Sequence, residues 1–476
     1  MRRALAIGAA AAACAAGLTG CGGGGSLGRP LSYLPAGTPA VALVNTDLDD
    51  SQWHTFNGEV APLLVQTSVR RILRETAQQA GLSFGDDVKP LLGNPLVVGV
   101  AGPGPALVAA LQVRDAGKLD RVLHALDFAP AGRYRGARLY RPPTAVGARL
   151  ARARQAAGGV GPLIAVDGDV VVAALDVAVL RRALDQRRGG GGLGEREVEH
   201  GLNGLPGDAL LRVYGNLRAV AAAAPAGLPW VRALRTYALS VTFKRRVIEA
   251  RAVVRTARAE VTDAQVPVAV GRAPAPIPIR EDQAVVGLRD VAPAAAFALG
   301  VLAGGGGGGV RATPGGAAVR SRGAAVALAA GILRQLAGPA FAAFDLDGDV
   351  WVRARVRDPR AAARALRGAA RRLGLRAVAG GLFRALRGRL VVGVVDGALV
   401  AGPSARDARQ TASEPTVGLS STHGGLVARA DLAALGAGIE RALGIQLGAL
   451  DELVAFVNAD RAGLRAVLRI GIRADT

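Results

Sequence analysis

The stretch ALQVRD, residues 110–115, decides how this chain is divided, because RARVRD at residues 353–358 repeats it 243 residues later. In both places, alternating apolar and polar residues predict a strand that runs into an aspartate. Asp115 and Asp358 can each cap the helix expected to follow. Pro359 stands at the first helical position, where its missing N–H costs nothing. We therefore expect one strand, turn and helix unit to occur twice.

Three further matches follow in the same order, with an offset that only shrinks. They are AVDGDVVVA and VVDGALVAG (165–173 and 394–402), LRVYGNL and LVARADL (211–217 and 426–432), and RAVVR and RAVLR (251–255 and 465–469). Strands of period two joined by Asp-Gly turns pair antiparallel. The sequence therefore predicts an α+β protein with two similar domains, each a mainly antiparallel sheet with helices on one face.

Composition shifts set the expected boundaries. The first α+β domain is predicted at residues 34–265 and the second, as an internal repeat, at 281–476. Between them, residues 266–280 include RAPAPIPI and predict an extended Pro-rich linker. Residues 1–20 are expected to be a signal peptide and residues 21–33 a flexible Gly-rich tether.

The N-terminus carries the features of a secretory signal. Arg2 and Arg3 precede an apolar run at 4–17 that is short for a membrane span, and LTGC closes it at 18–21. This order resembles the bacterial lipoprotein signal, in which the cysteine is acylated and becomes the new N-terminus. The resemblance assigns lipidation to Cys21, whereas Cys14 lacks the leucine and follows a shorter run. Ordinary secretion with a free Cys21 is the alternative.

Cys14 and Cys21 are the only cysteines of the chain. Without further thiols, the mature body has no disulfide, thiolate metal site or cysteine nucleophile. Lipid on Cys21 would hold the protein at the cell membrane, on its extracytoplasmic face. The membrane is then an expected partner of the protein, bound through the lipid on Cys21.

The formal charge of +22 raises the question of nucleic acid, which the composition argues against. All the basic residues except Lys89, Lys118 and Lys244 are arginines, scattered over both halves, and aromatic residues make up only 4%. A single-strand binding surface needs interleaved aromatics. We expect no nucleic-acid partner, and consider anionic lipid or acidic wall polymer the natural partner of this charge.

No motif predicts a catalytic residue, a metal or a cofactor. GGSLG at 24–28 fits G-x-S-x-G but lies in the tether, and the glycines at 189–194 follow a helix where a dinucleotide site would follow a strand. Asp345, Asp347 and Asp349 have calcium-loop spacing, but Val350 stands in place of the loop's glycine. We expect a hairpin at Asp347 and Gly348 instead.

The densest polar and aromatic cluster lies just after the first predicted strand. It consists of Asp47, Asp49, Asp50, Trp53 and His54. One interpretation is a binding site. The other is purely structural: Asp49 or Asp50 caps a helix, with Trp53 on its buried side.

One family resemblance covers most of the first half. LPAGT at 34–38, followed by a strand and an acidic DLD, and then FGDDVKPLLG at 84–93, is similar to an uncharacterised bacterial family of envelope proteins classed as a domain of unknown function. The resemblance implies extracytoplasmic attachment and no established activity. It transfers no catalytic residue.

These observations favour a membrane-anchored extracytoplasmic lipoprotein that binds or organises a component of the cell envelope without catalysis. Two alternatives remain open. One is a carrier of an apolar ligand or lipid held between or within the domains, which requires a continuous apolar cavity. The other is an envelope hydrolase that uses the carboxylates at 47–50 with His54.

Overall fold

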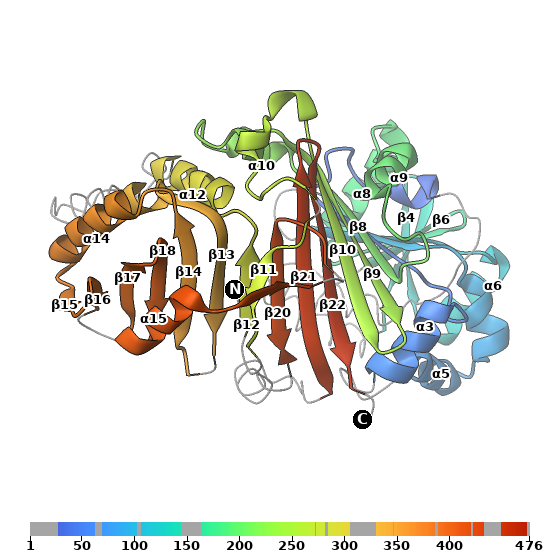
Figure 1. Cartoon of the computed structure of the whole chain (residues 1–476). Helices are drawn as coiled ribbons and strands as arrows, with labels where there is room; N and C mark the ends of the chain where they lie inside the picture. Colours follow the sequence, from blue (N-terminus) through green and yellow to red (C-terminus); the bar gives the residue numbers. More distant parts are fainter. Residues whose placement is uncertain are drawn as a thin grey trace. The chain divides into compact units, whose positions relative to one another are not determined.

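The structure is a computed structural model that describes residues 27–61, 69–101, 106–143, 163–271, 273–280, 284–304, 330–345, 347–385, 389–419, 422–432 and 449–473. Helices and strands both contribute, and every strand pairing with a resolved register is antiparallel (Figure 1). The predicted α+β class with antiparallel sheets is confirmed. The predicted signal peptide and Cys21 lie outside the described residues.

The chain forms two compact units. Unit 1 contains residues up to Asn216 together with Thr236–Ala250, and unit 2 contains Leu217–Arg235 and Arg251–Thr476. Each unit is described by itself below.

The sheet of unit 1 is built around β1 (Val41–Val44), which lies between β2 (Leu96–Val100) and β8 (Leu211–Asn216). The other strands add to these two neighbours. β8 pairs with β9 (Leu234–Lys244), and on the other side the order is β2, β3 (Leu107–Gln112), β7 (Val170–Ala174), β6 (Leu163–Asp167), β5 (Ala137–Arg141) and β4 (Ala129–Tyr134).

Helices of unit 1 follow from local capping signals. Asp115 caps α6 (Ala116–Ala125) and Asp176 caps α8 (Val177–Gly189) through backbone N–H groups that have no helical partner. The remaining helical elements are α2 (Gly28–Leu31), α3 (Ser51–Thr55), η1 (Phe56–Val60), α5 (Val69–Gln79), η2 (Phe84–Val88), η3 (Lys89–Leu91) and α9 (Glu195–Leu202). Apolar residues of α2, α8 and α9 share one core cluster with strands β1, β2, β3 and β7.

The sheet of unit 2 is built around β12 (Ala284–Leu288), which lies between β13 (Leu336–Phe344) and β20 (Leu426–Asp431). β20 pairs with β21 (Leu450–Asp460), and β21 with β22 (Gly463–Ile472). On the other side the order is β13, β14 (Val350–Val356), β18 (Ala398–Gly402), β17 (Val391–Val395), β16 (Leu382–Arg384) and β15 (Arg376–Val378). The pairings therefore follow the same order as those of unit 1.

Several smaller elements complete unit 2. They are α10 (Arg218–Ala223), α11 (Pro229–Arg232), η4 (Arg258–Glu260), η5 (Asp263–Gln265), and the last six residues of β10 (Val247–Thr256). Trp230 of α11 packs with Ala233, Val261 and Val266 in a core cluster of this unit.

Helices cover both faces of the sheet in unit 2, so the prediction of helices on one face is wrong there. Leu399 of β18 packs in the cluster that contains residues of α12 (Ala292–Gly304) and α14 (Pro359–Leu373). Its neighbour Val400 packs in the cluster that contains residues of α15 (Ala405–Ser413). Successive residues of a strand point to opposite faces. Because both faces of β18 are apolar, each face needs a cover.

The predicted linker at 266–280 belongs to the folded part of unit 2. Val266 and Ile277 are fully buried, and β11 (Pro276–Pro278) pairs with β19 (Thr416–Gly418). Proline is tolerated in a short strand of this kind, where few ladder hydrogen bonds are needed. The alternation of proline with apolar residues therefore encodes one strand of a separate two-stranded sheet and not a spacer.

The predicted tether at 21–33 also differs from the structure at its C-terminal end. Gly28–Leu31 is helical, and Leu31 and Tyr33 are buried in the core of unit 1. The apolar spacing of Leu27, Leu31 and Leu34 places three side chains on that core. None of the helices in the described ranges is long and apolar enough to cross a membrane.

Candidate functional site

Residues 27–35, which we call the N-terminal segment, are fastened into unit 1 by backbone contacts at both ends. The Leu27 N–H donates to Glu195 Oε1 at 2.7 Å, and the Leu193 N–H donates to the Leu34 carbonyl at 2.8 Å. Leu34 packs so closely on Gly99 of β2 that a Cβ there would lie 2.4 Å from Leu34 Cδ1. The glycine therefore makes room for the segment.

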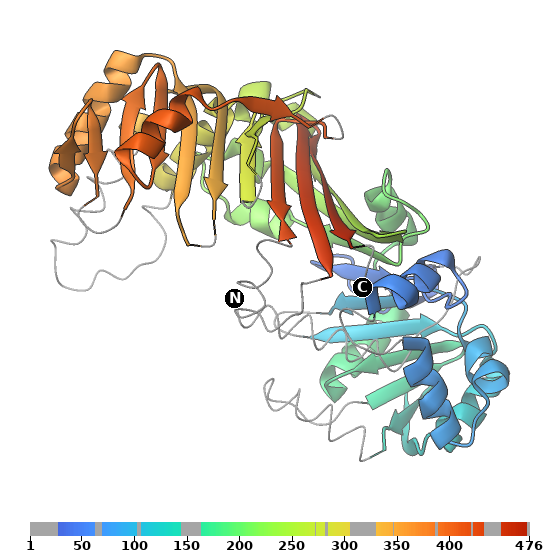
Figure 2. The ribbon, with the colours of Figure 1, turned by 60° about the horizontal axis from the view of Figure 1, so that its bottom comes forward.

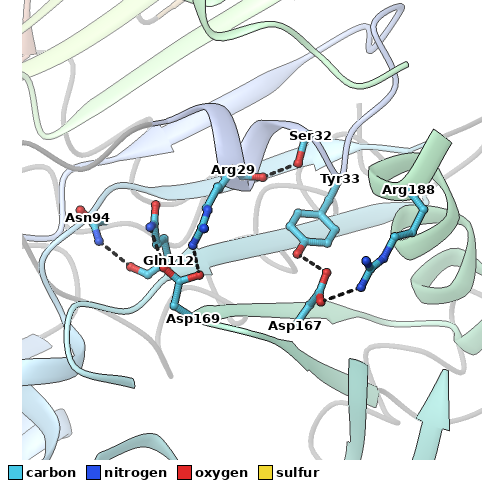
Figure 3. Close-up of polar contacts among 8 residues, drawn as sticks. All are labelled: Arg29, Ser32, Tyr33, Asn94, Gln112, Asp167, Asp169 and Arg188. Carbon is cyan, nitrogen blue, oxygen red and sulfur yellow. Dashed lines mark hydrogen bonds and ion pairs between the residues drawn. The ribbon is translucent and has the colours of Figure 1, made fainter. Parts of the chain in front are cut away.

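Tyr33 joins this segment to the β6–β7 hairpin. Its hydroxyl donates to Asp167 Oδ2 at 2.9 Å, and Arg188 of α8 donates to Asp167 Oδ1 at 3.2 Å (Figure 3). Burial raises the pKa of Tyr33, and the hydrogen bond to the Asp167 carboxylate raises it further. The phenol therefore stays protonated and acts as a donor.

A second carboxylate of the same hairpin receives the helical part of the segment. Asp169 forms an ion pair with Arg29 and accepts a hydrogen bond from Gln112 Nε2 at 2.8 Å (Figure 3). The Asn94 side chain in turn donates to the Gln112 carbonyl at 2.8 Å. Asp167 and Asp169 flank Gly168, so one tight turn supplies both acceptors for the N-terminal segment.

A hollow of about 430 Å³ opens beside Tyr33. Its lining residues come from the N-terminal segment, the residue that follows β2, α8 and the loop after α8. They are Tyr33, Pro35, Ala101, Arg182, Ala183, Asp185, Gln186, Gly189 and Gly191. Asp185 also accepts from the Tyr134 hydroxyl at 2.9 Å and from Arg135 Nε at 3.0 Å. The hollow thus presents the cation of Arg182, the amide of Gln186 and the carboxylate of Asp185, which is already hydrogen-bonded.

The acidic and aromatic cluster predicted after the first strand is brought together by the structure. Asp50 caps α3 by accepting from the Gln52 N–H at 2.7 Å. Trp53 is buried, its Nε1 donates to the Asn45 carbonyl at 3.0 Å, and Phe56 meets its ring edge-on. These two residues follow the structural interpretation.

The remaining members of the cluster lie nearer the surface. Asp49 forms ion pairs with Arg70, at 2.9 Å, and with Lys89, and the hydrogen bond from Lys89 lowers the pKa of Asp49. Asp47 accepts from the Asp49 N–H at 2.9 Å. His54 is exposed on α3. The carboxylates at 49 and 50 are therefore already committed to internal partners.

Other motifs can also be placed. β13 and β14 form the predicted hairpin, but its turn is longer than two residues, and Asp345 Oδ1 accepts from the Asp349 N–H at 2.8 Å. The Asp396–Gly397 hairpin has both residues at positive φ, as an Asp-Gly turn predicts. Within the described ranges, no group of three or more His, Cys, Asp or Glu side chains is arranged to hold a metal ion.

Sequence reasoning missed Tyr33, Asp167 and Asp169 as contacts of the N-terminal segment. Asp167 and Gly168 were predicted only as a turn. One sequence signal points to a packed N-terminal segment. In LGRPLSYL, at 27–34, just after the glycine run, leucines recur at helical spacing, which is not typical of a solvated tether.

Comparisons with known proteins place the chain in no family. No family model matches it, and no curated protein matches it. Among solved structures, crystal form III of TP0453 is 8% identical, with a TM-score of 0.26 over 50% of this chain and 83% of that chain. Crystal form IV of TP0453 is also 8% identical, with a TM-score of 0.29 over 48% of this chain and 81% of that chain. Likeness at these scores carries no argument about fold or function.

Proposed function

We propose that this chain is a lipid-anchored, extracytoplasmic binding protein of a bacterial envelope, attached through Cys21 to the outer face of the cytoplasmic membrane. The observation that supports it most is the short distance in sequence between anchor and core. Only residues 22–26 separate Cys21 from Leu27, which is buried in unit 1. Six residues span at most about 20 Å when fully extended. Unit 1 would therefore be held next to the bilayer.

We propose binding in preference to catalysis because the carboxylates once considered for a hydrolase have structural partners. Asp50 caps a helix, and Asp49 is paired with Arg70 and Lys89. His54 is exposed on the helix that Asp50 caps. The polar side chains that line the hollow beside Tyr33 suit recognition of a polar group more than of a lipid tail.

We further propose that the two units are copies of one ancestral domain. The strand pairings that surround β1 and β12 follow the same order, and the short sequence matches fall on corresponding strands. β3 with α6 corresponds to β14 with α14 in this scheme, and the β6–β7 hairpin corresponds to β17–β18.

The anchor is tested by metabolic labelling with a palmitate analogue in a bacterial host that processes lipoproteins. We expect label on the full chain and on Cys14→Ser, and none on Cys21→Ser. The Cys14 variant is the matched control, because it alters a cysteine of the same signal region. Label that persists in Cys21→Ser, or that disappears in Cys14→Ser, would overturn the assignment.

The carrier alternative is tested on the chain from Gly22 to Thr476, secreted and measured by native mass spectrometry. We expect the mass of the polypeptide alone. An excess mass that disappears on denaturation would instead identify a carrier with its cargo.

A further inference from the structure

The strongest unexplained feature of unit 2 is a row of arginines on α14. Residues 359–395 contain nine arginines and no lysine, aspartate or glutamate. Five of the arginines lie on α14 itself, and all five are exposed. Positive side chains on one helix repel one another and destabilise the helix unless an anion neutralises them.

Four of these arginines form one straight row. Arg360, Arg364, Arg367 and Arg371 follow the spacing i, i+4, i+7, i+11, which places them within about 60° of arc and along about 16 Å of the helix. The buried side chains of α14, among them Leu366 and Ala369, lie on the other side. The apolar face is thus used for the core of unit 2, and the arginine row faces away from it.

The row lacks internal ion-pair partners in the part of the chain that the structure describes. No ion pair within 4 Å involves any of its four arginines there, whereas fifteen other pairs are formed. Two acids lie beside the row: Asp358, which caps the helix and interacts electrostatically with Arg364 and Arg360, and Asp396 in the next hairpin. Asp358 accepts from the N–H groups of Arg360 and Ala361, at 2.8 and 2.9 Å.

The corresponding helix of unit 1 is arranged differently. On α6, Lys118 donates to the Asp86 carbonyl at 2.6 Å, and Arg121 lies 3.4 Å from Asp87. Asp120 of the same helix pairs with Arg138 at 2.8 Å. At the offset of 243, Arg364 of the row corresponds to Arg121 of α6. Arg121 has a carboxylate partner within unit 1, whereas Arg364 forms no ion pair within 4 Å in the described ranges.

A hollow of about 390 Å³ lies beside the row. It is lined by Pro359, Arg360, Ala363, Arg364, Arg367, Val394, Asp396 and Gly397. Three arginines and one carboxylate, that of Asp396, therefore line a space large enough for one phosphate-bearing group. Guanidinium matches phosphate oxygens in a bidentate geometry.

We propose that the arginine row of α14 is a docking surface for a bilayer that contains anionic phospholipid, with headgroup phosphates bound between the arginines. This inference deepens the proposed function, on which it rests, by naming the partner of unit 2. An exposed, convex row of cations suits a flat anionic surface. Each arginine near such a surface strengthens binding about five-fold, so the row is comparable to a second anchor.

The test uses the chain from Gly22 to Thr476, which keeps every residue that the structure describes and carries no lipid. Vesicles of equal parts phosphatidylglycerol and phosphatidylcholine are sedimented with the protein, beside vesicles of phosphatidylcholine alone. We expect binding only to the anionic vesicles, weakening as salt is raised. In Arg364→Gln/Arg367→Gln/Arg371→Gln the partition coefficient should fall by about 100-fold, on the order of five-fold per arginine.

Two control variants distinguish an effect of the arginine row from an effect of total charge or of misfolding. Arg74→Gln/Arg196→Gln/Arg245→Gln removes the same charge from three exposed arginines of unit 1 and should bind within about three-fold of the parent. Arg364→Lys/Arg367→Lys/Arg371→Lys keeps the charge and should restore most of the binding.

Equal losses in both Gln variants would overturn the proposal in favour of nonspecific charge. Binding of the parent chain to soluble polyphosphate but not to the anionic vesicles would also overturn it, in favour of an acidic polymer. Because the protein tested carries no lipid, either failure leaves the Cys21 labelling result unaffected, and the two proposals fail separately.

Discussion

The two units differ in how they secure the segment that leads into their first central strand. In unit 1 the N-terminal segment is held by buried apolar side chains, by the Tyr33 hydroxyl on Asp167 and by an ion pair between Arg29 and Asp169 that is open to solvent. In unit 2 the segment that contains β11 is followed by Arg280. Its guanidinium donates two hydrogen bonds to the Glu414 carboxylate, at 2.5 and 2.7 Å. Similar strand orders therefore leave room for two arrangements. Unit 1 has an apolar fastening with an exposed ion pair, and unit 2 has an ionic fastening in which the ion pair is largely buried.

Figure 2 shows the strands of each unit from a second direction. β11 and β19 form a separate two-stranded sheet, and Ile277 of β11 packs with Val285 of β12 and Ala343 of β13. Glu414 lies just before β19, and its backbone carbonyl accepts from Arg353 Nη1 at 2.8 Å. The Arg280 guanidinium also stacks over Trp351, 4.6 Å from the ring centre. The ionic fastening is therefore a network that spans β11, β14 and β19.

The largest expected effect comes from breaking this network. Arg280 and Glu414 are only 16% and 13% exposed, so Glu414→Gln leaves a guanidinium largely buried without its counter-charge. We expect a loss of about 3 kcal/mol in the free energy of unfolding, measured by urea denaturation with tryptophan fluorescence. Glu452→Gln, which removes the more exposed partner of Arg429, should cost at most about 1 kcal/mol. Equal losses of stability in Glu414→Gln and Glu452→Gln would show that burial does not strengthen the ion pair between Arg280 and Glu414.

The apolar fastening of unit 1 is tested at Leu31, which is fully buried in the core cluster. Leu31→Ala should lower the free energy of unfolding by about 3 kcal/mol or slightly less, through lost burial and a residual cavity. Val220→Ala, at a half-exposed position of α10, should change it by less than about 0.5 kcal/mol. A negligible effect of Leu31→Ala would show that the N-terminal segment is dispensable for unit 1.

The polar part of the same fastening should contribute less. Tyr33→Phe removes the donor to Asp167 and should cost about 1 kcal/mol at neutral pH. Because the pKa of Tyr33 is raised on folding, its stabilising effect is complete below about pH 10 and is lost as the pH rises further.

The parent chain should therefore lose stability more steeply than Tyr33→Phe in alkaline urea titrations. Tyr134→Phe, whose hydroxyl meets Asp185, serves as the control for loss of a hydrogen-bonded phenol. An identical alkaline slope in the parent and Tyr33→Phe would contradict the role assigned to burial.

The smallest effect concerns the caps of α6 and α14. Asp358 accepts from two N–H groups, at 2.8 and 2.9 Å, and Asp115 from one, at 3.1 Å. The hydrogen bond from the Ala361 N–H lowers the pKa of Asp358, so its contribution is present above about pH 4 and disappears as the pH falls below that. Asp358→Ala should lower Tm at neutral pH more than Asp115→Ala, and the difference should vanish in acid.

Local chemistry made part of this fold predictable. Asp115 and Asp358 cap helices as their position after alternating strands indicates, and Asp396 with Gly397 forms the expected tight turn. The α+β class followed from the same periodicities. What failed were inferences from composition alone: glycine next to the N-terminal segment and proline at 274–278 were read as flexible or extended spacers.

The contacts of the N-terminal segment could not be predicted because they are remote in sequence. Tyr33 meets Asp167, and Leu27 meets Glu195, 134 and 168 residues away. Local sequence patterns span too few residues to reveal contacts at such separations. The arginine row is not predicted from composition either, because the arginines are scattered over both halves of the sequence. Only the fold determines which of these charges lie on one helix face and which find partners.

The central position of β1 has a consequence for how the protein forms. β1 lies between β2 and β8, so its second edge stays open until residue 216 has been made. The same holds for β12, whose partner β20 comes more than 130 residues later. Non-local closure of this kind slows folding and leaves strand edges exposed in the meantime. A chain that emerges N-terminus first would therefore expose an unpaired central strand twice, once for each unit.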